Sequence, residues 1–135
     1  MTAICFALNL ETCRFDTNYN IMLSGYVSEA EFDGLINQCN EILEPLAQDL
    51  LEYHKGASAS CCFAFSAMSK AQALQSKRKQ LLIEVENAVK TFSQTHLRPR
   101  KIQAILKNRT IHGHRVHHID DWIEFNIHPE AIRIE

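Results

Sequence analysis

Two adjacent cysteines, Cys61 and Cys62, lie in the small, apolar and uncharged stretch Gly56–Met68. A thiol can carry a thioester-linked acyl chain, and nearby bases strengthen binding to an anionic leaflet by about 1 kcal/mol each. The residues that could contact a membrane or a partner with them are Phe63, Phe65, Met68, Lys77, Arg78 and Lys79. The residues alone favour this anchor and a buried apolar connection with inert thiols equally.

Four histidines form a second group that could do chemistry, namely His112, His114, His117 and His118. Asp120 and Asp121 follow them, and imidazole and carboxylate groups are zinc ligands. The spacing differs from the H-E-x-x-H motif, and no cysteine lies nearby in the sequence. The sequence therefore predicts a polar hairpin loop, with zinc binding as the weaker alternative, and no cofactor is expected.

Catalytic motifs are absent from the sequence. It contains no G-x-S-x-G, no P-loop and no G-x-G-x-x-G. Five cysteines and seven histidines make chance thiol–imidazole pairs easy to draw, so none of them is a supported nucleophile. We therefore expect a protein that is not an enzyme.

The net charge of −2 hides an uneven distribution. Residues 1–56 carry nine acids and two bases, residues 57–119 carry eleven bases and two acids, and residues 120–135 carry five acids and one base. The basic block attracts phosphate, of lipid headgroups or of nucleic acid, or it is simply a solvated face. No aromatic residues interleave the bases around Arg98 and Arg109, and the isoelectric point is near 6.4, so nucleic acid is not expected.

The length and the cysteines restrict the class of protein. The 135 residues suffice for one domain, residues 1–135, with a real core. The cysteine count is odd, no C-x-x-C occurs, and the start lacks a basic and apolar leader. These features indicate free thiols in a reducing compartment. No apolar run approaches the ~20 residues that span a bilayer.

The first half of the chain predicts two strands and a helix. Ile4–Leu8 reads as a strand, with Thr12–Thr17 as its hairpin partner, and Gly25 can take a positive φ in the connection that follows. Ser28 and Glu31 form a capping box at the start of an amphipathic helix. Pro45 either kinks this helix or opens another, and Gly56 ends the helical region.

The second half predicts a helix and two strands. The helix runs from about Ser69 to Thr95, and Pro99 ends the helical region. Lys101–Asn108 and Trp122–His128 read as strands, with the histidine-rich connection Ile111–Ile119 between them. The order β-β-α-α-β-β predicts an α+β domain with two long helices packed on one face of an antiparallel sheet.

One pattern in the N-terminal half resembles a known superfamily. The pattern consists of Phe15, Leu23, Gly25, Val27, Glu31, Phe32, Ile36, Asn37, Asn40 and Leu43. It resembles the cysteine-rich hydrophobic (CHIC) proteins, which belong with golgin A member seven and the yeast Ras-palmitoyltransferase accessory subunit. The order of the later segments is also similar, over about residues 4–128.

The resemblance implies a non-catalytic subunit that binds and stabilises a DHHC-type palmitoyltransferase, an integral membrane enzyme. The location would be the cytosolic face of the Golgi or plasma membrane, against an anionic membrane surface. The residues implied as partner-binding or core positions of the first helix are Phe32, Leu35, Ile36, Asn37 and Asn40. The alternative is a peripheral protein of vesicle traffic, palmitoylated on Cys61 and Cys62, without an enzyme partner. CHIC proteins carry a denser cysteine string there, so the pair favours the accessory subunit.

Overall fold

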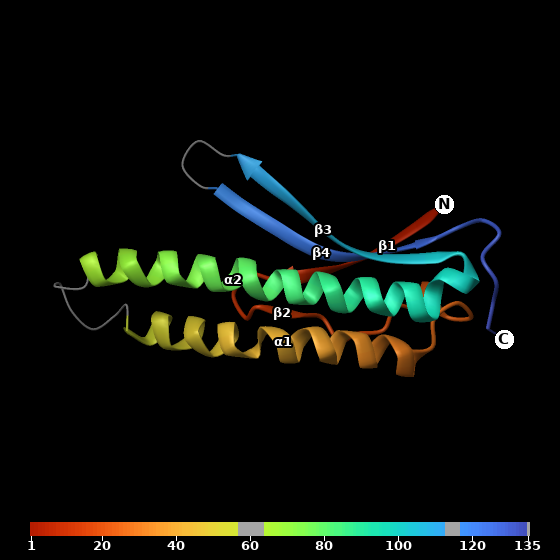
Figure 1. The fold of residues 1–135 in the computed structure, drawn as a ribbon, viewed down its shortest axis with the longest axis horizontal. Helices are drawn as coiled ribbons and strands as arrows, with labels where there is room; N and C mark the ends of the chain where they lie inside the picture. Colours follow the sequence, from red (N-terminus) through yellow and green to blue (C-terminus); the bar gives the residue numbers. More distant parts are fainter. Residues whose placement is uncertain (57–63, 113–116, 135) are drawn as a thin grey trace.

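A computed structural model describes residues 1–56, 64–112 and 117–134. The four strands form one antiparallel sheet in the order β2-β1-β4-β3. The strands are β1 (Thr2–Asn9), β2 (Arg14–Phe15), β3 (Ile102–His112) and β4 (His117–Ile127). Two long helices, α1 (Glu29–Gly56) and α2 (Ala64–Phe92), pack side by side on one face of the sheet (Figure 1). This confirms the predicted fold class and the order of its elements.

The sheet follows from the alternation of apolar residues. Ile4 pairs with Phe125 on β4, and Phe125 pairs with Ala104 on β3, so that three buried side chains line up on the face toward the helices. The next residues along each strand point to the opposite face, as the two-residue period of a strand requires. Cys5, Glu124 and Ile105 lie in one such outer row.

The first helix begins as the capping box predicts. The Ser28 hydroxyl accepts the backbone N–H of Glu31, and the Glu31 carboxylate accepts the backbone N–H of Ser28, both at 3.1 Å. The helix then continues through Pro45 as a single element and ends at Gly56. Pro45 therefore does not open a second helix.

Several boundaries differ from the prediction, and the hairpin partner expected over Thr12–Thr17 is a strand only at Arg14–Phe15. Helix α2 begins at Ala64 rather than at Ser69, and a π-helical turn, Ser93–Leu97, follows it. The predicted connection Ile111–Ile119 is too long, because the β3–β4 pairing continues to the pair His112 and His117. In Figure 1 this end of the hairpin rises away from the two helices, so the strands there need no apolar alternation.

An aromatic cluster joins the two layers. The Phe6 ring on β1 lies 4.7 Å from the Phe32 ring on α1 and 5.7 Å from the Phe125 ring on β4, centroid to centroid. Tyr19 packs edge-on against Phe32 at 5.6 Å.

Among the described residues, no helix is both long and apolar enough to span a bilayer.

Candidate functional site

Three residues of the first-helix pattern are core residues. Phe32, Leu35 and Ile36 are at most 1% exposed. They were expected as partner-binding or core positions, and the structure gives them the second role. A partner cannot touch their side chains unless the fold opens.

Asn40 holds the short strand β2 in place. The backbone N–H of Phe15 donates to Asn40 Oδ1 at 2.8 Å, and Asn40 Nδ2 donates to the Phe15 carbonyl at 3.2 Å. The carboxamide thus satisfies both polar backbone groups of Phe15, as a neighbouring strand would. Asn37, one turn earlier, is exposed and is the member of the set that a partner can reach.

Glu31 has a second role beyond the helix cap. Arg100, which lies just before β3, donates to both Glu31 carboxylate oxygens at 2.9 Å and also to the Tyr26 carbonyl at 3.1 Å. Hydrogen bonding to Arg100 is the main cause that lowers the Glu31 pKa to about 2, with the Ser28 bonds adding to it and burial opposing it. This fork fixes the start of β3 against the start of α1.

Two of the bases expected to contact a membrane form ion pairs with acids of the same chain. Lys77 Nζ lies 2.5 Å from Asp49 Oδ2 on α1. Arg78 forms an ion pair with Asp121 on β4, whose side chain is only 4% exposed. Lys79 is exposed. Lys77 and Arg78 therefore link α2 to its neighbours, although the Lys77 side chain stays 38% exposed.

The expected lipidation site falls mostly outside the described residues. Cys61, Cys62 and Phe63 belong to the range 57–63, which the structure leaves out. Phe65 and Met68 fall within α2, but their side chains are not described. Their membrane contact stays a prediction.

The histidines are divided between two strands. His112 ends β3 and is paired with His117, while His118 is paired with Ile111. His114 lies outside the described residues. Within the described part of the chain, no three His, Cys, Asp or Glu side chains are grouped as a metal ion requires. Zinc binding by the loop itself stays a prediction.

The described thiols are not activated nucleophiles. Burial raises the pKa of Cys13 and raises that of Cys39 to about 12. Burial and the neighbouring Glu124 carboxylate raise the pKa of Cys5, although this side chain is exposed. A raised pKa leaves the thiol protonated at neutral pH and slow to react.

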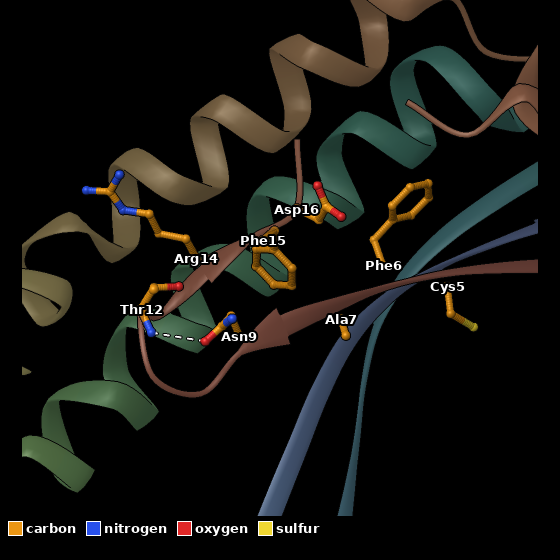
Figure 2. Close-up of a pocket in the computed structure, with 8 residues that line it drawn as sticks. All are labelled: Cys5, Phe6, Ala7, Asn9, Thr12, Arg14, Phe15 and Asp16. Carbon is orange, nitrogen blue, oxygen red and sulfur yellow. Dashed lines mark hydrogen bonds between the residues drawn. The ribbon is translucent and has the colours of Figure 1, made fainter. Parts of the chain in front are cut away.

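Two hollows lie where β2 leaves β1, a region that we call the β1–β2 corner. A hollow of about 440 Å³ is lined by Cys5, Phe6, Ala7, Asn9, Thr12, Arg14, Phe15 and Asp16. Figure 2 shows β1 on one side of it and the returning segment on the other. A second hollow, of about 690 Å³, is lined by Arg14 and Asp16 together with Glu41 and Glu44 on α1. Sequence reasoning missed this site, although the uncharged run from Thr2 to Leu8 was visible.

Charges at the corner are mostly negative. Arg14 reaches over to α1 and pairs with Glu44 at 2.7 Å (Figure 2). Asp16 accepts the backbone N–H of Asn18, and Glu41 is exposed on α1. The two hollows together therefore carry three carboxylates against one guanidinium group, which suits a positively charged ligand.

Comparison with protein-family models, with curated proteins and with solved structures found no match to this chain.

Proposed function

We propose that this protein is a non-catalytic accessory subunit that binds and stabilises a DHHC-type palmitoyltransferase at a membrane. It holds a cytosolic segment of the enzyme by surface contact, and its loss lowers the amount of active acyl-enzyme. The proposal joins the sequence resemblance to the places that the pattern residues occupy in the fold.

The main support for this proposal is the structural role of the residues that carry the resemblance. Glu31 binds Arg100, Asn40 binds Phe15, and Phe32 and Ile36 fill the core. Each of these residues serves to hold the α1 helix to the neighbouring elements, and Asn40 and Phe15 also line the hollow between β2 and α1. A pattern that specifies a scaffold fits a protein that acts through its surface.

The ion pairs of α2 favour this reading over a self-anchored protein. A two-signal anchor needs bases that are free to face an anionic leaflet. Lys77 and Arg78 pair with Asp49 and Asp121 instead. This weakens the electrostatic half of an anchor at Cys61 and Cys62 and leaves the partner as the main link to a membrane.

The test is purification of the tagged protein from its own cells in mild detergent, followed by mass spectrometry. We expect a multi-spanning DHHC protein in comparable amount, and we expect it to be retained when Cys61→Ser and Cys62→Ser are combined. Depletion of the protein should lower the acyl-enzyme level. Release of the double variant to the cytosol, with acyl groups on the wild-type thiols and no enzyme recovered, would establish the self-anchored alternative.

A further inference from the structure

The open side of β1 can be identified from its neighbours. Successive residues of a strand direct their backbone N–H and C=O groups to alternate sides. Phe15 uses both groups to bind Asn40, so they point away from β1. The backbone N–H and C=O of its partner Leu8 must then point away from β2, toward β4. The backbone groups of Ala7, Cys5 and Ala3, which are an odd number of residues away from Leu8, point to the opposite side, where β2 lies.

Strand β3, at the other edge of the sheet, shows independently which backbone groups of β1 point outward. The backbone N–H of Ala104 on β3 donates to Ser93 Oγ at 3.0 Å, so the backbone groups of Ala104 point away from β4. Counting across the register from Ala104 through Phe125 to Ile4 places the Ile4 groups toward β4. The neighbouring residues Ala3 and Cys5 therefore point outward, in agreement with the first argument.

These outward groups lie on an open edge. Strand β2 pairs with β1 only at Leu8 and Asn9, and it diverges before it reaches Ala7. Ala3, Cys5 and Ala7 are exposed, and among the described residues no hydrogen bond reaches their backbone groups on that side. An exposed edge with small, uncharged side chains and no proline accepts an added strand.

We propose that the edge formed by Ala3, Cys5 and Ala7 binds an extended, basic cytosolic segment of the partner enzyme as an added strand. The segment runs along β1 and ends in the β1–β2 corner, where its Lys or Arg side chains meet Asp16 and Glu41. The inference rests on the proposed function for the identity of the partner, but not for the location of the edge.

A second copy of the chain fits this edge less well. Residues 1–56 carry nine acids and two bases, and α1 packs beneath β2 at this side of the molecule. Pairing β1 with its own copy would bring two acidic regions together, which is repulsive. The copy's β2 would also occupy part of the same edge. A basic segment of another protein meets neither obstacle.

Two substitutions block the edge in different ways. Cys5→Pro removes the outward N–H and leaves the pairing with β4 intact, because proline is tolerated at strand edges. Cys5→Ser is its control. Ala7→Lys places a charge on the edge, and Gln103→Lys makes the same change on the same outer face of β3. We expect each blocking variant to lower recovery of the partner about tenfold, and each control to leave it unchanged.

Photocrosslinking in cells locates the occupant. A photoreactive residue replaces Ala3 or Ala7, whose side chains flank the edge, and Gln103 serves as the control position. We expect both edge positions to crosslink to one segment of the partner, at sites separated as Ala3 and Ala7 are, because paired strands keep their spacing. Cys5→Pro should abolish both adducts, and Gln103 should give none.

The other results overturn the proposal in distinguishable ways. Adducts to residues 1–9 of a second copy would identify a homodimer. Recovery of the acyltransferase without adducts at Ala3 or Ala7, and unaffected by Cys5→Pro, would keep the proposed function and exclude the edge. Adducts from Ala3 and Ala7 to a basic segment of a different protein, at sites with the same spacing, would support the β1 edge as the binding site. They would refute the acyltransferase as the partner. The absence of adducts to any polypeptide would refute the edge.

Discussion

At the β3 edge of the sheet, the backbone N–H of Ala104 is bound by Ser93, and Lys107 and Arg109 pair with Glu124 and Asp120 on the neighbouring strand. At the β1 edge, Ala3, Cys5 and Ala7 present small, uncharged side chains. Folded proteins usually protect edge strands with charges, prolines or covering segments, because an open edge pairs with other chains. The fold thus protects one edge and leaves the other available, and this difference is our main reason to look for a partner at β1.

The two edges are also fastened to the helices differently. The Glu31–Arg100 fork fixes the segment that enters β3, and Asn40 fixes β2 at the far side of β1. Neither contact covers the residues from Ala3 to Ala7. Four substitutions test how far each edge depends on these contacts.

Loss of the fork should have the largest effect. Glu31→Gln removes a carboxylate with a pKa of about 2 in the folded protein, against 4.5 as its ordinary value. Because the folded pKa is depressed, the stabilisation is complete above pH 4.5 and is lost as the pH falls toward 2. We expect the variant to lose about 3 kcal/mol of unfolding free energy at pH 7, measured by urea titration. The difference from wild type should shrink below pH 4.5. Glu29→Gln, in the same turn but exposed, is the control, and a pH-independent difference would contradict the assignment.

Asn40→Ala should have the second largest effect. It leaves the N–H and C=O of Phe15 without their partners, at a cost of about 2 kcal/mol in unfolding free energy. Amide exchange at Phe15 should also become faster, because the side of β2 that faces away from β1 then has no hydrogen-bond partner. Asn37→Ala is the matched control on the exposed side of the same helix. Equal stability of the two variants would show that Asn40 does not fasten β2.

Ser93→Ala tests the protection of the β3 edge. It removes the acceptor of a buried hydrogen bond to Ala104, and we expect a loss of about 1–2 kcal/mol by denaturant unfolding. Gln94→Ala changes an exposed neighbour and should be neutral. An unchanged stability for Ser93→Ala would mean that the hydrogen bond to Ala104 does not protect the β3 edge. The difference between the β3 and β1 edges would then no longer indicate a partner at β1.

Ala7→Lys should have the smallest effect on folding. The side chain is exposed on the outer face, so the free energy of unfolding should change by less than about 0.5 kcal/mol. The same thermal melt should show Gln103→Lys within the same margin. A loss of more than 1 kcal/mol would indicate that the protein itself already uses the β1 edge.

The sequence predicted the fold where the determinants are local. Ser28 and Glu31 are three residues apart, and the alternation from Ile123 to Ile127 lies within one strand, so both are visible in the sequence. The long histidine loop was predicted wrongly because the polar residues of the outer hairpin show no such alternation.

The site depends on contacts that the sequence does not display. Nothing near Asn40 shows that its carboxamide meets Phe15, and nothing near Arg78 shows that Asp121 lies opposite. A basic run on a helix looks the same whether it faces a membrane or an acid on another strand. The open edge is also a tertiary property, since it depends on where β2 diverges from β1.

Pro45 has a consequence for the order in which α1 opens. Proline has no N–H, so the Glu41 carbonyl lacks its usual donor and the helical ladder is interrupted there. Unfolding of the helix from Gly56 therefore reaches this missing hydrogen bond before it reaches Asn40. Amide hydrogens between Ala47 and Gly56 should exchange as a separate, faster group than those from Leu35 to Leu43. The end of α1 that leads toward Cys61 can thus rearrange while the half that supports the β1–β2 corner keeps its shape.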